Sequence, residues 1–162
     1  LSGAALGAVL GLALAAPIAA QHAGAPSDAH VASGLSLWKA NGCFNCHGEY
    51  GEGGEGGHFP AGPSLRATSL DAASLHEVIA CGIPGTLMPY NAAGAYESRE
   101  CYGITGGAPK EVTPGSALSD EQIGDIVAYL ETWVVGQRPR ITLAQCTYYH
   151  GDANDPACVG LR

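Results

Sequence analysis

The segment "NGCFNCHGEY", residues 41–50, contains two cysteines in C-x-x-C spacing and a histidine directly after the second. Cys43, Cys46 and His47 each carry a group that can ligate a metal or form a covalent bond. Side chains of this chemistry that lie so close together must converge on one bound group or on each other. This motif therefore constrains the fold more than any other feature of the chain.

Three interpretations of the motif compete. A structural zinc site needs four ligands, typically arranged as two close pairs. The remaining cysteines include no second C-x-x-C; they are Cys81, Cys101, Cys146 and Cys158. A thioredoxin-like redox dithiol would need a β-α-β context, which the neighbouring sequence lacks. Covalent haem attachment is favoured, because each thiol can add to a haem vinyl group and the adjacent histidine then lies under the iron.

The opposite face of such an iron needs a second ligand or an open position. The chain has a single methionine, Met88, in "GTLMPY". Methionine is usually a core filler, but this one lies beside Pro89 in a Gly/Pro-rich segment instead of on an apolar helical face. We interpret Met88 as the second axial ligand.

Charge and composition limit the possible partners and folds. Fifteen acidic and seven basic residues give a formal net charge of −8, which argues against nucleic acid or an anionic lipid surface as a partner. A basic or mixed-charge protein surface is the expected partner. The chain has 162 residues, 24 of them glycine, and only 14% are charged, which indicates one loop-rich main domain.

The first residues, 1–20, form an apolar stretch without any charge, followed by a linker at 21–32. The stretch is either a signal peptide cleaved before Gln21 or a membrane anchor, in which Gly3, Gly7 and Gly11 would form a ridge for helix packing. We expect an uncleaved helix that holds the protein on the periplasmic side of a bacterial inner membrane. A soluble periplasmic protein is the alternative.

Export implies an oxidising compartment, in which the four remaining cysteines can form two disulfides. Of the three possible pairings we choose Cys81 with Cys101 and Cys146 with Cys158. Each bond then joins the nearest partner without spanning the long helix near the C-terminus. The first bond would clamp the loop that carries Met88.

Three helices are expected. The first leads into the motif over residues 33–43, and the second lies within 69–82, with Ser69 or Asp71 as its cap and Gly82 as its stop signal. The third and clearest lies within 117–136, where Ser119 is the cap and apolar residues form one stripe. Residues 91–116 and the tail at 136–162 are expected to be loops.

Four elements, "CFNCH", "GPSL", "GTLMPY" and "LSDEQIGDIVAYL", follow one another in an order that resembles the class I c-type cytochromes over residues 33–135. The resemblance implies a small all-α fold whose N- and C-terminal helices cross beside one covalent haem c. Gly34 and Trp38 would be the positions that meet the last helix near Tyr129 and Leu130. The chain would then be an electron-transfer protein and not an enzyme.

The resemblance also implies the role of each site residue. Cys43 and Cys46 form the thioethers, His47 and Met88 are the axial ligands, and the carbonyl of Pro63 accepts the ring N–H of His47. That hydrogen bond would orient the imidazole and raise its basicity. The expected partners are redox proteins associated with a membrane. A permanent cytochrome subunit of a membrane or dehydrogenase/oxidase complex is the alternative function, and a catalytic haem with an open sixth position is disfavoured by Met88.

Other polar side chains receive simpler interpretations. The histidines outside the motif are expected at the surface; they are His22, His30, His58, His76 and His150. Tyr90 and Tyr96 flank the Met88 segment and either bind a haem propionate or pack in the core. The long connection after Met88 and the disulfide-bonded tail at 136–162 are docking surfaces or, as we favour, lineage-specific additions.

Overall fold

The computed structural model describes residues 27–54, 59–137 and 139–162. The expected anchor at 1–20, most of the linker, His22 and His58 lie outside these ranges. None of the helices in the described part of the chain combines the length and the apolar character needed to cross a membrane.

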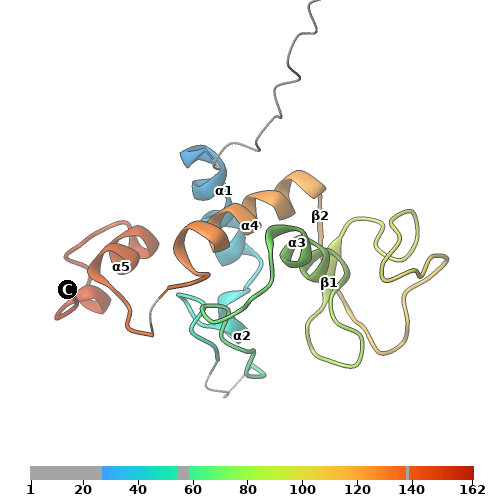
Figure 1. Cartoon of the computed structure of the whole chain (residues 1–162), viewed down its shortest axis with the longest axis horizontal. Coiled ribbons are helices and arrows are strands. Elements are labelled where there is room, and N and C mark those ends of the chain that lie inside the picture. Colours follow the sequence, from blue (N-terminus) through green and yellow to red (C-terminus); the bar gives the residue numbers. More distant parts are fainter. Residues whose placement is uncertain (1–26, 55–58, 138) are drawn as a thin grey trace, which may run out of the picture.

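The secondary structure is mostly helical. In chain order the elements are α1 (Asp28–Ala40), α2 (Phe44–His47), α3 (Ala72–Cys81), β1 (Tyr90–Ala92), β2 (Pro114–Leu118), α4 (Asp120–Trp133), α5 (Leu143–His150) and the 3₁₀ helix η1 (Pro156–Cys158). Helices α1 and α4 cross at the centre of the molecule (Figure 1). Helix α5 lies at one end and the two strands, with the long loop between them, lie at the other.

The crossing of α1 and α4 is the closest helix contact. It depends on Gly34, because a Cβ at this position would overlap the backbone carbonyl of Asp125 and lie 2.8 Å from the Cβ of Tyr129. One turn later Trp38 packs against Tyr129, with 6.0 Å between ring centroids. The predicted contact of Gly34 and Trp38 with the last helix is therefore present. The apolar stripe of α4 is buried beneath it, namely Ile123, Ile126, Val127 and Leu130.

Side-chain caps define where the helices begin. Ser119 and Gln122 form a reciprocal capping box at the start of α4, and Asp71, not Ser69, caps α3. Helix α1 is capped by Ser27 and begins at Asp28, so it starts inside the segment predicted as a linker.

His30 is not the freely solvated side chain that the sequence predicts. It lies on the first turns of α1, where its Nδ1 is 2.5 Å from a carboxylate oxygen of Asp125 on α4. The imidazole is about half exposed, with 54% of its side-chain surface accessible, whereas the Asp125 side chain is nearly buried. The pair is a second link between α1 and α4, and it was missed because its partner is distant in the sequence.

The expectation of an all-α fold is wrong in one respect. Strands β1 and β2 pair in parallel, with Tyr90 opposite Pro114 and Ala92 opposite Leu118. The segment between them, predicted as part of one long loop, leaves and rejoins the core through this small sheet. Because β1 begins two residues after Met88, the sheet fixes one end of the Met88 segment.

We predict that Gly34→Ala destabilises the protein by about 2 kcal/mol, because the new methyl group meets backbone atoms that cannot move aside. Gly124→Ala is the matched control, since α4 leaves open space at that position. It should be neutral or stabilising by up to about 1 kcal/mol, from helix propensity alone. Guanidinium unfolding of both variants measures the difference, and equal stabilities would contradict the tight crossing.

Candidate functional site

The C-x-x-C-H motif is placed by the end of α1. Gly42 adopts a positive φ of 67°, which turns the chain so that the Cys43 N–H donates to the carbonyl of Trp38 (3.1 Å). The motif then continues through the single turn of α2. Cys43 and Cys46 are the free cysteines of the described chain. Burial raises the pKa of the Cys43 thiol to about 11.

His47 is oriented by the loop that follows it. Its Nδ1 lies 3.0 Å from the carbonyl oxygen of Pro63, which is the contact predicted for this pair. The loop approaches closely here, because Gly62 donates its N–H to the carbonyl of Cys46 (2.7 Å). A Cβ on Gly62 would lie 2.9 Å from His47 Nδ1. The imidazole therefore presents one nitrogen to the Pro63 carbonyl, and its other nitrogen is left for another partner.

Met88 lies in a turn formed by residues 83–88. The N–H of Ile83 donates to the carbonyl of Met88 (3.2 Å), and the N–H of Met88 donates to the hydroxyl of Thr86 (3.1 Å). The N–H of Gly85 donates to the carbonyl of Glu111 (2.9 Å), which lies in the long loop between the strands. The Met88 side chain is half-buried against the core. The backbone of this turn is thus held by local and distant hydrogen bonds.

The chain entering the Met88 turn is clamped at the end of α3. Cys81 and Cys101 form a disulfide with a Cα–Cα distance of 5.5 Å. Gly82 has a φ of 64°, and a Cβ there would lie 2.6 Å from backbone atoms of Pro89. The hydroxyl of Tyr102 donates to the carbonyl of Gly82 (2.7 Å). The long loop therefore braces the start of the Met88 turn.

Asn91 fixes the chain that leaves the turn. Its amide nitrogen donates to the carbonyls of Ile79 (3.1 Å) and Pro89 (3.2 Å). Its amide oxygen accepts the N–H of Ser116 (3.2 Å). One side chain thus links α3, the residue after Met88 and strand β2. This role was not predicted, because an asparagine in a Gly/Pro-rich segment usually indicates only a turn.

Tyr96 packs in the core, which is one of the two roles that the sequence left open. It is fully buried, and its hydroxyl donates to the carbonyl of Cys81 (2.8 Å). Tyr90 packs against its edge, with 5.6 Å between ring centroids.

His76 is half-buried, and its Nε2 lies 3.3 Å from the carbonyl of Asp120.

The tail is ordered against the loop that follows the motif, contrary to the expectation of an irregular segment. Cys146 on α5 is bonded to Cys158 on η1, the pairing predicted from the sequence. The hydroxyl of Tyr50 lies 3.0 Å from His150 Nε2 and 3.3 Å from Cys146 Sγ. Burial, with smaller contributions from nearby carboxylates, raises the pKa of Tyr50 to about 12, so the phenol keeps the proton that it donates.

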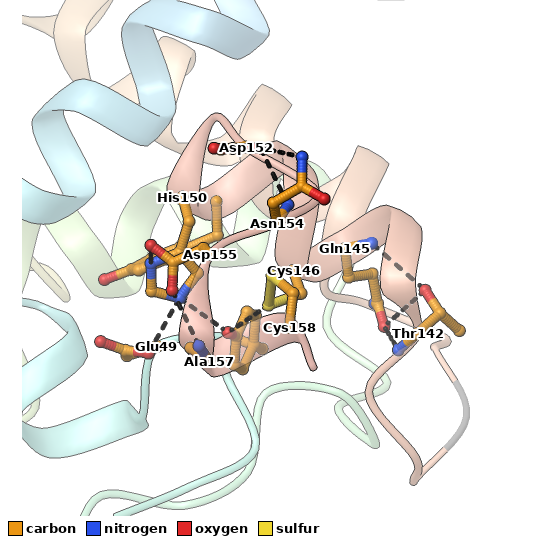
Figure 2. The surroundings of a disulfide bond; sticks show 12 residues. Glu49, Thr142, Gln145, Cys146, His150, Asp152, Asn154, Asp155, Ala157 and Cys158 are labelled. Atoms are coloured by element: carbon orange, nitrogen blue, oxygen red, sulfur yellow. Dashed lines mark hydrogen bonds and ion pairs between the residues drawn. A yellow bond between two sulfur atoms is a disulfide. The ribbon is translucent and has the colours of Figure 1, made fainter. Parts of the chain in front are cut away.

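His150 is therefore not the solvated side chain that the sequence predicts. Figure 2 shows it at the end of α5, facing Asp155 on one side and Glu49 on the other. Its Nδ1 lies 3.7 Å from a carboxylate oxygen of Asp155, and its Nε2 lies 3.6 Å from one of Glu49. The tail thus reaches the loop only two residues beyond His47.

Arg66 makes a second connection between this loop and the tail. Its buried guanidinium donates to the carbonyls of Tyr50 (3.3 Å) and Arg140 (3.2 Å) and to the side chain of Gln145 (3.4 Å). Gln145 also forms a capping box with Thr142 at the start of α5. That Thr-x-x-Gln spacing is a sequence signal for a helix start, and it could have identified α5.

A protein-family model described as Cytochrome c matches residues 31–133. The matched range runs from the first turns of α1 to the last residue of α4, and it includes the C-x-x-C-H motif and Met88. No curated protein and no solved structure matches the chain.

We predict that Asn91→Ala destabilises the protein by about 1–3 kcal/mol, because it leaves partly buried backbone groups of α3 and β2 without their Asn91 partner. Asn154→Ala is the matched control. Asn154 is exposed, and its side chain contacts only Asp152 nearby in the chain, so its loss should change stability by less than about 0.5 kcal/mol. Thermal unfolding compares the two, and an equal effect would show that Asn91 is not a brace.

Proposed function

Because this chain belongs to the cytochrome c family, whose members bind haem covalently and transfer electrons, we propose that it is a periplasmic one-electron carrier. It holds a single haem c through thioethers at Cys43 and Cys46. His47 and Met88 are the axial ligands. The observation that carries this proposal is the C-x-x-C-H motif with both of its thiols free and its histidine hydrogen-bonded to the Pro63 carbonyl.

The side chains around the motif fit such a group. Cys43 and Cys46 are not bonded to each other, whereas the other four cysteines of the chain are paired in disulfides. Exposed apolar side chains lie on the segments near Met88 and Pro63, namely Phe59, Leu70 and Ile83. A large flat apolar group held by the motif would give these side chains an apolar partner in place of water.

When bound, the haem supplies one iron centre that gains or loses a single electron. The chain contributes a constant ligand set, so no bond is made or broken and no proton is transferred. The Pro63 carbonyl holds the tautomer and the orientation of His47. The disulfide at Cys81 and the hydrogen bonds of Asn91 limit movement of the Met88 turn. A rigid ligand set lowers the reorganisation that accompanies each electron transfer.

The cellular location belongs to the same proposal. Two disulfides in a chain of this size are typical of an oxidising compartment, and residues 1–20 are apolar and uncharged. We place the haem domain on the periplasmic side of a bacterial inner membrane, tethered by that segment. Tethering would raise the local concentration of the domain at a membrane-bound redox partner. The net charge of −8 favours a partner with a basic or mixed-charge surface.

A permanent subunit of a membrane or dehydrogenase/oxidase complex is the second candidate. Ile104 on the long loop and Val159 on the tail are large apolar side chains that are exposed. A partner subunit that contacted either segment would cover them. Purification from native membranes under mild conditions distinguishes the candidates, because a subunit remains with its complex whereas a carrier separates from it.

We predict that Met88→Ala leaves the haem attached, since the thioethers do not involve this residue, but opens the sixth position of the iron. The reduction potential should fall, because thioether ligation favours the reduced iron. The reduced variant should also bind carbon monoxide. Redox titration and absorption spectra measure these changes.

Leu87→Ala is the matched control for this experiment, because Leu87 is the neighbouring residue and is largely exposed. It should keep the near-infrared charge-transfer band of ferric iron bound to a thioether, and it should resist carbon monoxide. Retention of that band by Met88→Ala would show that Met88 is not the ligand. Carbon monoxide binding by the unmodified protein would instead favour a catalytic, open-site haem.

A further inference from the structure

A chain of aromatic rings leads from the haem-binding motif to the tail. The imidazole of His47 lies 6.2 Å from the indole of Trp38, measured between ring centroids. Trp38 is 6.0 Å from Tyr129, and Tyr129 is stacked 6.5 Å from Tyr148. Tyr148 is stacked 4.3 Å from Trp133. Each ring is adjacent to the next, and together they connect α2, α1, α4 and α5.

The chain of rings ends at the molecular surface. Trp133 and Tyr148 line a shallow apolar depression between the end of α4 and α5, together with Leu143, Ala144 and Thr147. Both rings are partly exposed, whereas Trp38 and Tyr129 are buried. The row of aromatic rings therefore runs without a gap from the buried core to the depression between α4 and α5.

Trp38 is the central ring between the haem-binding motif and the last helix. It is buried, and its indole N–H has no hydrogen-bond partner in the described residues. The indole is a large π system, and it lies between the imidazole of His47 and the ring of Tyr129.

We propose that Trp38, Tyr129, Tyr148 and Trp133 form an electron-transfer route between the haem and the α4–α5 surface. The inference rests on the proposed function. An external donor at the surface loses one electron and ferric iron gains it, giving ferrous iron. The rings mediate tunnelling and are chemically unchanged afterwards. Aromatic π systems couple donor and acceptor more strongly than saturated side chains because their orbitals lie closer in energy to the transferring electron.

The tyrosines on this route remain protonated. Burial raises the pKa of Tyr129 above its ordinary value. Burial also raises the pKa of Tyr148, with a smaller contribution from the carboxylate of Asp28. Because neither phenol ionises, the route requires no proton release, and a phenylalanine should replace Tyr148 without loss.

The test uses the haem-loaded protein with a photoactive ruthenium bipyridyl label. Ala144→Cys places the label in the depression, and Ala73→Cys places a control label at an exposed position of α3. Thioether and disulfide sulfurs do not react with the labelling reagent. After a laser flash, the Soret absorbance reports reduction of the haem and the emission lifetime of the label reports electron loss from it. Each labelled protein is then combined with Tyr148→Leu or Tyr148→Phe.

We expect Tyr148→Leu to slow haem reduction from the Ala144→Cys label severalfold and to lengthen the emission lifetime of that label. Tyr148→Phe should retain the original rate, and neither variant should change the rate from the Ala73→Cys label. Redox titration should give the same haem potential in all variants. The route is overturned if haem reduction from the Ala144→Cys label is as fast with Tyr148→Leu as in the protein that carries only the label. It is also overturned if Tyr148→Leu slows haem reduction equally from both labels, because such a result indicates a change at the haem. Absence of haem reduction from either label contradicts the proposed function itself.

Discussion

The close approach of α1 to α4 at Gly34 is the contact on which the other features of the structure depend. Because residue 34 has no side chain, α1 can rest on the backbone of α4 at Asp125. This depth of contact brings Trp38 onto Tyr129 and sets the point where α1 ends. The C-x-x-C-H motif starts within three residues of that end, so its position relative to the core is determined by the crossing. A larger residue at position 34 would move both helices and the motif together.

The Met88 turn is held in place differently from the C-x-x-C-H motif. His47 is positioned by helix packing and by a loop close to it in sequence, whereas Met88 lies in a turn with no regular structure of its own. That turn is stabilised by the disulfide of Cys81, the side chain of Asn91 and the backbone hydrogen bond that Gly85 donates to the Glu111 carbonyl. Of these links, the disulfide also restricts the unfolded chain, because it is covalent. The long loop between the strands, interpreted from the sequence as a docking surface or, as we favoured, a lineage-specific addition, therefore supports the Met88 turn.

The parts of the structure that could be predicted are those encoded locally. The motif, the α3 and α4 caps and the two nearest-neighbour disulfides are each recognisable within a short stretch of sequence. Strands β1 and β2 were missed because a short parallel pair joins segments far apart in sequence and lacks the alternation of apolar residues that identifies a half-buried strand. His30 and His150 were interpreted as solvated for the same reason. Their partners, Asp125 and Tyr50, come from distant elements.

The tail packs against the cytochrome c domain, although it lies outside the family match. The match ends at Trp133, and the ring that stacks on Trp133 belongs to Tyr148, beyond that end. A segment that only covered the surface would bury Trp133 under small or aliphatic side chains. Here it extends the aromatic core outward while leaving Trp133 partly exposed. The same helix contacts the loop after His47 through His150. The tail therefore contacts both the end of α4, through Tyr148, and the loop after His47, through His150. The disulfide from Cys146 to Cys158 and the buried guanidinium of Arg66 hold α5 in the position that makes both contacts.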